Sequence, residues 1–233
     1  MEGPEVALRL SALLVPIALA ACAAPARLSL PRSAMLEAPE GPLTPEGRAS
    51  PVPSFASRGG AEAVDGEAIA ATARTFLGRK SVNDATTSFP EDCTGLLRAV
   101  YARHHIDLLA EGALPGDNGV TAIWRYAQVH GRLHRDAPRP GDVVFFAETY
   151  DRNRDGREND GLTHVGVVDA VDEDGTVHVI HRVARGVVSY RMNLSHPADR
   201  KDVRGHVVND WLREGKQSRL AGELFAGYGT LSR

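Results

Sequence analysis

The chain has only two cysteines in 233 residues, no excess of positive charge and no internal repeat. Its formal net charge of -3, its pI near 6.3 and the lack of a basic stripe argue against a nucleic-acid partner. The most apolar run, LRLSALLVPIALAA from Leu8 to Ala21, is too short to span a bilayer as a stable helix. With 42% hydrophobic and 24% charged residues, the composition is that of an ordinary globular protein.

That apolar run has the length of a signal-peptide core, which predicts a processing segment over residues 1–21. It ends in LAAC at positions 19–22, which resembles the bacterial lipobox, where a peptidase cuts before a cysteine that carries diacylglycerol. We therefore expect Cys22 to anchor a lipoprotein in a bacterial cell envelope, facing the periplasm, and Ala23 in place of Asp favours the outer membrane. The alternative is an ordinary leader, cleaved or uncleaved.

The rest of the chain divides into a tether and one domain. Residues 22–60 are rich in Pro, Ala, Ser and Gly, a composition typical of a flexible linker. Residues 61–233 have the length of a single domain, which we expect to be monomeric.

Apolar residues at helical spacing predict helices early in this domain, and β-rich runs separated by turn residues predict strands later. Helices followed by an antiparallel meander make an α+β fold. The C-terminal run LAGELFAGY has apolar residues on one helical face, which predicts a packing helix and hence a C-terminal helical extension. The expected helices span 67–77, 92–104, 120–130 and 220–228, and the expected strands span 142–146, 163–171, 176–182 and 187–192.

Cys93 follows Asp92, a good helix N-cap. A thiol in the first turn of a helix faces unpaired N–H groups and the positive end of the helix dipole, so we expect a lowered thiol pKa. If Cys22 is acylated, Cys93 has no disulfide partner in its own chain. The alternative role is a small core residue, because Cys93 shares one helical stripe with Leu97, Val100, Tyr101 and His104.

A cysteine nucleophile needs an imidazole to take its proton and a third polar group to orient that imidazole. Two histidines, His164 and His181, lie on consecutive predicted strands. They can act together only if their side chains point to the same face of the sheet.

The turn between these strands decides that question, since side chains alternate along a strand. If Thr176 pairs with Val171 or with Glu173, the two histidines share a face, and the first of these registers places them diagonally. His178 would then project from the opposite face. A turn of odd length would instead exchange the roles of His178 and His181.

Four sequence blocks occur in a fixed order: DCTGL at 92–96, RPGDVVFF at 139–146, THVGVV at 163–168 and VIH at 179–181. They resemble the successive blocks of the NlpC-type cell-wall peptidases and the related CHAP amidases. The resemblance implies a papain-like fold in which N-terminal helices, one bearing the cysteine, pack on an antiparallel sheet.

The same resemblance implies a peptidoglycan hydrolase that cleaves an amide bond of the wall's stem peptides. Cys93 would be the nucleophile, His164 the general base and acid, and His181 the orienting residue, with no cofactor required. The chain lacks the Tyr and Trp-Gly-Gly block that many relatives carry before the cysteine, so the group that completes an oxyanion hole with the Cys93 N–H is not identified. Two other functions stay open: a catalytically silent lipoprotein that binds the wall or regulates another hydrolase, and a lipid acyltransferase.

An insertion, DRNRDGRENDG at 151–161, precedes the His164 strand. Oxygen-bearing residues at alternate positions followed by glycine match the first half of an EF-hand-type calcium loop. The twelfth position is Leu162, so Asp160 or Glu158 would supply the missing ligand, and a structural Ca²⁺ would fix the start of the strand. The alternative is a solvated polar loop whose arginines offset the carboxylates. The candidate ligands are Asp151, Asn153, Asp155 and Asp160.

Overall fold

Three helices come first in the part of the chain that the structure describes, and they pack against a sheet built mainly from later segments. The structure is a computed structural model that describes residues 64–215 and 217–232. The predicted leader at 1–21, the tether at 22–60 and Cys22 lie outside these described residues. The helices are α1 (Gly66–Arg74), α2 (Cys93–Ala102) and α3 (Gly119–His130).

Each helix begins at a capping side chain, as the sequence predicts for α2. The side chains of Asp65, Asp92 and Asn118 each accept a backbone N–H bond from the first turn of the helix that follows. Such a cap satisfies a donor that has no partner within the helix, which fixes where the helix starts. None of the three described helices is long and apolar enough to cross a membrane.

The described strands form a six-stranded antiparallel sheet and a separate two-stranded hairpin. The order in the main sheet is β1-β8-β2-β3-β4-β5, and the hairpin pairs β6 with β7. The α+β class that the sequence predicts is thus confirmed. The strands are β1 (Arg132–His134), β2 (Val143–Ala147), β3 (Leu162–Val171), β4 (Val177–Val183), β5 (Gly186–Met192), β6 (Trp211–Arg213), β7 (Arg219–Leu220) and β8 (Phe225–Thr230).

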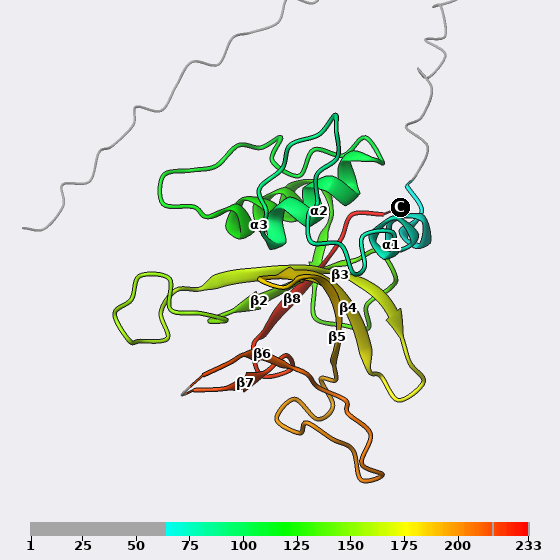
Figure 1. Ribbon diagram of the computed structural model, residues 1–233, viewed down its shortest axis with the longest axis vertical. Coiled ribbons are helices and arrows are strands. Elements are labelled where there is room, and N and C mark those ends of the chain that lie inside the picture. The colour runs from blue at the N-terminus through cyan, green and yellow to red at the C-terminus, as the bar shows by residue number, and fades with distance from the viewer. Residues whose placement is uncertain (1–63, 216, 233) are drawn as a thin grey trace, which may run out of the picture. The chain divides into compact units, whose positions relative to one another are not determined.

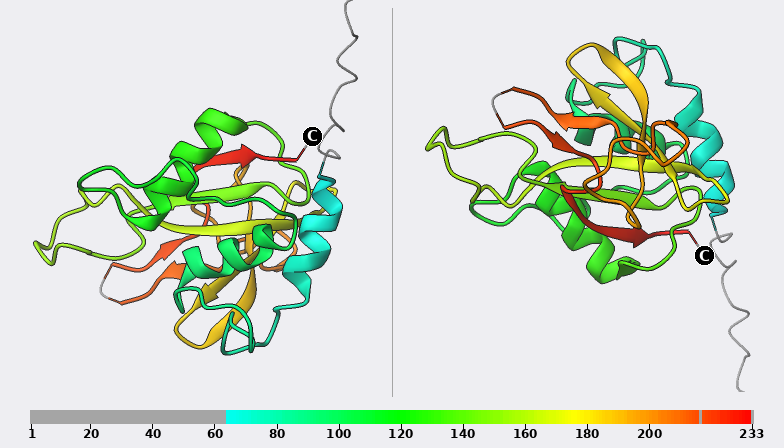
Figure 2. Two further views of the ribbon diagram at one scale, coloured as in Figure 1. Left: turned by 90° about the horizontal axis from the view of Figure 1, so that it is seen from above. Right: turned by 90° about the horizontal axis from the view of Figure 1, so that it is seen from below.

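The main sheet is covered on both faces. Figure 1 shows the helices on one side and the β6–β7 hairpin on the other, and Figure 2 shows the same layers from above and below. Along β2, Val143 and Phe145 join the core cluster beneath the helices, whereas Val144 and Phe146 join a second cluster with the C-terminal segment. Side chains alternate along a strand, so the unbroken apolar run VVFF fits a strand that is buried on both faces.

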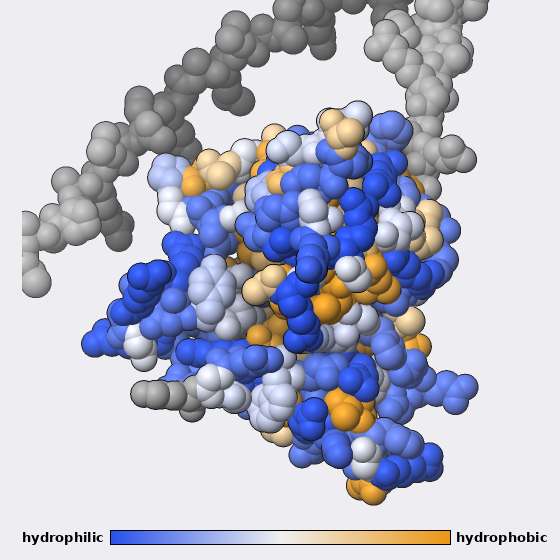
Figure 3. All heavy atoms as spheres, in the orientation of Figure 1, coloured by the Kyte–Doolittle hydropathy of each residue, from blue (hydrophilic) through white to orange (hydrophobic). Residues whose placement is uncertain are grey.

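The surface in Figure 3 is mostly hydrophilic, with hydrophobic atoms gathered between the helices and the sheet. This distribution is what a sheet covered by amphipathic helices produces, because each helix turns its apolar stripe inward.

The predicted C-terminal helix at 220–228 is wrong. This run forms the end of β7, a turn and most of β8, which lies between β1 and β2 in the sheet. Gly222 lies in the turn and packs closely on Pro197, since a Cβ atom on it would lie 2.7 Å from the Pro197 Cα. The backbone of β8 pairs with two neighbouring strands, a non-local arrangement that the local pattern does not contain.

Candidate active site

Cys93 is the first residue of α2, and its thiol is buried, with the residue 8% exposed. Burial raises the pKa of the Cys93 thiol to about 12, and the nearby Asp92 carboxylate raises it further. Backbone N–H groups of Val165 and Thr94 lower it only in part. The predicted lowering of this pKa is therefore wrong, because loss of water around the thiolate outweighs the helix terminus.

The start of α2 is held by a close approach of two backbone segments. A Cβ atom on Gly95 would lie 1.7 Å from the Pro90 carbonyl oxygen. The Asp92 side chain accepts the Gly95 N–H at 2.9 Å. Only glycine fits at this position, and the fit brings the residues before Cys93 across the end of the helix.

The β3–β4 register places both candidate histidines on one face of the sheet. At the turn Val171 pairs with Val177, which matches neither of the two registers considered for the turn and leaves a turn of odd length. A bulge between Val168 and Ala170 shifts the register by one residue. Beyond the bulge the strands follow the register that a pairing of Val171 with Thr176 would have set, because Val168 lies opposite Val179. The prediction that the two histidines share a face is confirmed.

His164 and His181 are joined by a hydrogen bond of 2.7 Å between Nε2 of the first and Nδ1 of the second. Burial lowers the pKa of His164 to about 4, against a small opposing effect of Asp92. Burial also lowers the pKa of His181 well below its usual range, helped by His164 and Arg185. Both imidazoles are therefore neutral at neutral pH, and one proton lies between them.

Two tautomer arrangements are compatible with this bond, since either ring can donate the shared proton. His181 Nε2 is buried and has no hydrogen-bond partner among the described residues. If His164 donates its Nε2 proton, His181 carries its own proton on Nε2, and His164 Nδ1 is left free to accept another proton. His178, as predicted, lies apart from this pair and contacts Asp172 at 2.8 Å.

Cys93 and His164 line the same cavity, whose volume is about 590 Å³. Cys93 belongs to the core cluster under the helices, whereas His164 contacts Phe146 of the second cluster, with ring centroids 6.2 Å apart. Within the part of the chain that the structure describes, no hydrogen bond joins the thiol to either imidazole. The arrangement is a neutral thiol and a neutral imidazole that open onto one space, which suits proton transfer coupled to attack on a bound carbonyl.

Arg182 also lines the cavity, and sequence reasoning missed it. Its guanidinium donates to the backbone oxygens of Glu91 and Lys80 and pairs with the Glu91 carboxylate at 3.0 Å. The residue therefore ties β4 to the segment that leads into Cys93. The sequence does contain a signal for this role. Arg182 directly follows His181 on the strand, so its side chain points to the face of the sheet opposite to His181.

The predicted calcium ligands lie together in one loop. Asp151 accepts N–H bonds from residues 155 and 156, and Asp160 accepts N–H bonds from residues 152 and 153. The side chains of Asn153 and Asp155 contact each other at 3.2 Å. In residues 64–215 and 217–232, no group of three or more His, Cys, Asp or Glu side chains is placed to hold a metal ion. These contacts close the loop by themselves, and calcium binding stays a prediction.

Residues 83–182 match the family model of the CHAP domain, and CHAP domains are typically hydrolases of the amidase or peptidase type. No curated protein and no solved structure matches the chain significantly. The matched segment runs from before α2 to near the end of β4 and contains Cys93, His164 and His181. It confirms the resemblance to CHAP domains that the order of the four sequence blocks predicts.

Proposed function

We propose that the protein is a peptidoglycan hydrolase in which Cys93 attacks an amide bond of a stem peptide. The observation that carries this proposal is the shared cavity, which brings the thiol at the start of α2 and His164 to one space, with His181 hydrogen-bonded to His164 behind it. The CHAP match supports the reaction class, since these domains act on peptidoglycan.

In the proposed reaction, His164 Nδ1 takes the Cys93 proton while the sulfur bonds to the amide carbonyl carbon. Both groups are neutral at rest, so the proton moves during attack and not before it. The resulting oxyanion lies near the N–H groups at the start of α2. His164 then gives its proton to the amine nitrogen as the C–N bond breaks, which leaves a thioester. Water attacks the thioester carbonyl while His164 takes a water proton; the C–S bond then breaks, the carboxylic acid leaves, and His164 returns the proton to the Cys93 sulfur.

His181 would act by holding His164 in the reactive tautomer. With its Nδ1 accepting the His164 Nε2 proton at 2.7 Å, Nδ1 of His164 is the nitrogen left to accept the thiol proton. When His164 becomes imidazolium, the same bond stabilises the positive charge.

The proposal is tested by incubating the full chain with purified peptidoglycan and identifying the products by mass spectrometry. We expect cleavage by the wild type and a loss of about 10³-fold or more in Cys93→Ala, because the nucleophile is removed. His178→Ala is the matched control and should retain activity, since this histidine lies outside the cavity. Intact muropeptides with wild-type protein, or unchanged cleavage by Cys93→Ala, would refute the proposal. Product masses separate a stem-peptide endopeptidase from an amidase that cuts next to muramic acid.

The lipid anchor at Cys22 is part of the proposed function, because it would hold the enzyme at a membrane next to the wall. Cys22→Ala should move the protein from the membrane fraction to the aqueous fraction of cells. Retention of the variant in the membrane fraction would contradict the anchor and leave the hydrolase proposal untouched.

A second candidate function is wall binding without catalysis. It is favoured by the buried thiol, whose pKa is raised to about 12 by burial. Muropeptide binding by a wild-type protein that leaves the muropeptides intact would select this function.

A further inference from the structure

Tyr150 lies in the loop between β2 and β3 and lines the same cavity as Cys93. The residue is 51% exposed, and its hydroxyl forms no hydrogen bond with any other residue that the structure describes. Burial of part of the ring raises the Tyr150 pKa, and the nearby Cys93 raises it further. The phenol therefore keeps its proton at neutral pH and can donate it to a ligand.

Other polar side chains around the cavity already have partners. The Thr149 hydroxyl bonds to the Thr163 hydroxyl at 2.9 Å, and Asn118 Nδ2 donates to the Leu162 carbonyl at 2.7 Å. Arg182 is engaged with the segment before Cys93, as described above. Tyr150 differs from these residues in presenting a free donor close to the thiol.

The backbone around Tyr150 is held on both sides. Thr149 N–H donates to the Thr163 hydroxyl at 2.8 Å, and both threonines are buried. The Glu148 carboxylate accepts N–H bonds from Asp160 at 3.1 Å and Gly161 at 2.6 Å. These bonds close the base of the loop, so the side chain of Tyr150 is carried on a fixed segment.

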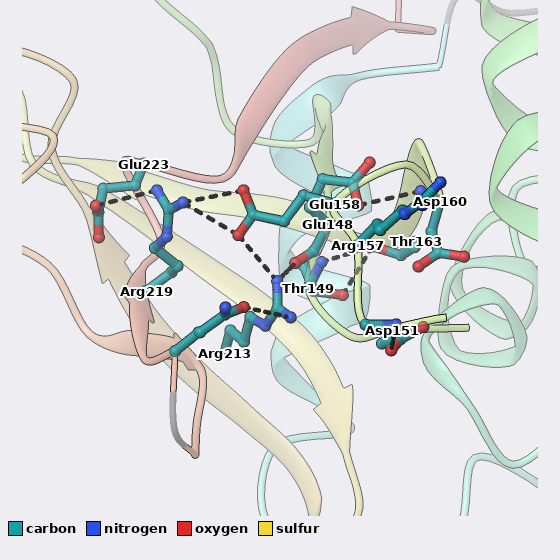
Figure 4. A network of polar contacts seen from close by, with 12 residues as sticks. Glu148, Thr149, Asp151, Arg157, Glu158, Asp160, Thr163, Arg213, Arg219 and Glu223 are labelled. Atoms are coloured by element: carbon teal, nitrogen blue, oxygen red, sulfur yellow. Dashed lines mark hydrogen bonds and ion pairs between the residues drawn. The ribbon is translucent and has the colours of Figure 1, made fainter. Parts of the chain in front are cut away.

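A cluster of charges fastens the far part of the loop to the β6–β7 hairpin. Glu158 pairs with Arg219 at 3.0 Å and with Arg213 at 3.3 Å, and Arg213 also donates to the Glu148 carbonyl at 3.1 Å (Figure 4). We call these three residues, Glu158, Arg213 and Arg219, the loop clamp. The hairpin lies beyond the segment that matches the CHAP domain, so this attachment belongs to the C-terminal part of the chain.

We propose that the Tyr150 hydroxyl donates a hydrogen bond to the carbonyl oxygen under attack, completing an oxyanion hole with the Cys93 backbone N–H, and that the loop clamp positions Tyr150. This inference rests on the proposed function, because it assigns a further catalytic residue to the same reaction. It supplies the donor that the sequence before Cys93 does not identify.

Two thiol reagents separate this role from any other. In acylation by p-nitrophenyl acetate, the Cys93 sulfur bonds to the ester carbonyl, the thiol proton passes to His164, and p-nitrophenolate leaves. A tetrahedral oxyanion forms on the way. In alkylation by iodoacetamide, the sulfur bonds to carbon and iodide leaves, without an oxyanion. Only the first reaction should depend on Tyr150.

The test uses the full chain with Cys22→Ser, so that Cys93 is its one thiol, and compares it with Tyr150→Phe. We expect acylation, followed by p-nitrophenolate absorbance, to slow by about 100-fold, the usual effect of losing one oxyanion donor. Alkylation should stay within about twofold, since it forms no oxyanion. An equal loss in both reactions, or no loss in either, would overturn the role.

The loop clamp is tested with Glu158→Gln, and Glu223→Gln is the matched control. Glu223 pairs with Arg219 at 3.5 Å but takes no part in the loop's contacts. Glu158→Gln should slow acylation less than Tyr150→Phe does, and Glu223→Gln should not slow it. In the double variant with Tyr150→Phe, Glu158→Gln should cause no further loss, because the clamp acts through Tyr150. A further loss in that double variant would refute the positioning role.

Cleavage of muropeptides is measured on the same proteins. Tyr150-dependent acylation without muropeptide cleavage would overturn the hydrolase proposal and retain the oxyanion donor. If the wild-type protein cleaves muropeptides and Tyr150→Phe leaves acylation unchanged, the hydrolase proposal is retained and the role of Tyr150 is overturned.

Discussion

At the scale of single residues, the reacting pair is uncharged before substrate arrives. Burial raises the pKa of Cys93 to about 12 and lowers that of His164 to about 4. A thiolate and an imidazolium would each lose hydration in this pocket. The ion pair therefore has to be stabilised by the substrate complex, which places the donors around the oxyanion at the centre of the mechanism.

This resting state predicts the pH dependence of Cys93 alkylation in the full chain with Cys22→Ser. Because the thiol pKa is raised, the thiolate fraction at pH 7 is far below that of a free thiol, whose pKa is about 8.5. We expect iodoacetamide to react roughly tenfold or more slowly than with glutathione at pH 7. The rate should still rise above pH 9. A rate that is already constant below pH 7 would show a preformed ion pair and contradict the expectation.

Predictions about single residues succeed where they depend on a local sequence pattern and fail where they depend on tertiary packing. The common face of His164 and His181 depends on the two-residue period of a strand, which the sequence contains, and on the register of β3 with β4, which the bulge sets and no local pattern contains. The direction of the Cys93 pKa shift depends on how closely β3 packs against the start of α2, and no local pattern contains that. Tyr150 was missed for a similar reason, since only the folded loop brings it to the cavity.

At the scale of elements, the start of α2 depends on the contact between Gly95 and Pro90. Gly95→Ala would place a Cβ atom 1.7 Å from the Pro90 oxygen, so the segment before Cys93 must move. We expect a loss of about 1–3 kcal/mol or more in the free energy of unfolding by urea, as for other overpacked sites.

Gly119→Ala is the control for this substitution, since the atom nearest to its Cβ would be the end of the Thr94 side chain, at 3.1 Å. Its loss of stability should be smaller. If Gly95→Ala is as stable as the wild type, the start of α2 can rearrange to accept the added methyl group, and the prediction is wrong.

The elements that sequence patterns predict best are those with local signals. The three helices and strands β2 to β5 lie within a few residues of their predicted bounds. Strands β1 and β8 were not predicted, because β8 is recruited into the sheet by partners far away in the chain. The apolar residues of its run suit a helix equally well, and only tertiary pairing decides between the two.

At the scale of the whole molecule, the buried histidine pair makes stability depend on pH. Both pKa values are lowered in the folded state by burial, so below the unfolded value of about 6.5 the unfolded chain binds more protons. Stability is complete above about pH 6.5 and is lost as the pH falls toward the folded value of about 4 for His164. Each histidine contributes up to about 1.4 kcal/mol per pH unit.

Urea unfolding at pH 7 and pH 5 measures this dependence. His181→Gln should reduce the change in the free energy of unfolding, since one buried imidazole is gone. His206→Ala should leave it unchanged, because the His206 side chain is 74% exposed. The same change in all three proteins would assign the pH dependence to other groups.

The bulge in β3 has a consequence for how the chain can vary in length. Its extra residue, Asp169, is bound by Arg74 of α1 through a side-chain bond of 2.5 Å and a backbone bond of 3.0 Å. The bulge shifts the pairing of β3 with β4 by one residue between the turn and the histidine pair. A one-residue insertion or deletion in the β3–β4 turn can therefore keep His164 and His181 on one face of the sheet, provided that the bulge is lost or gained at the same time.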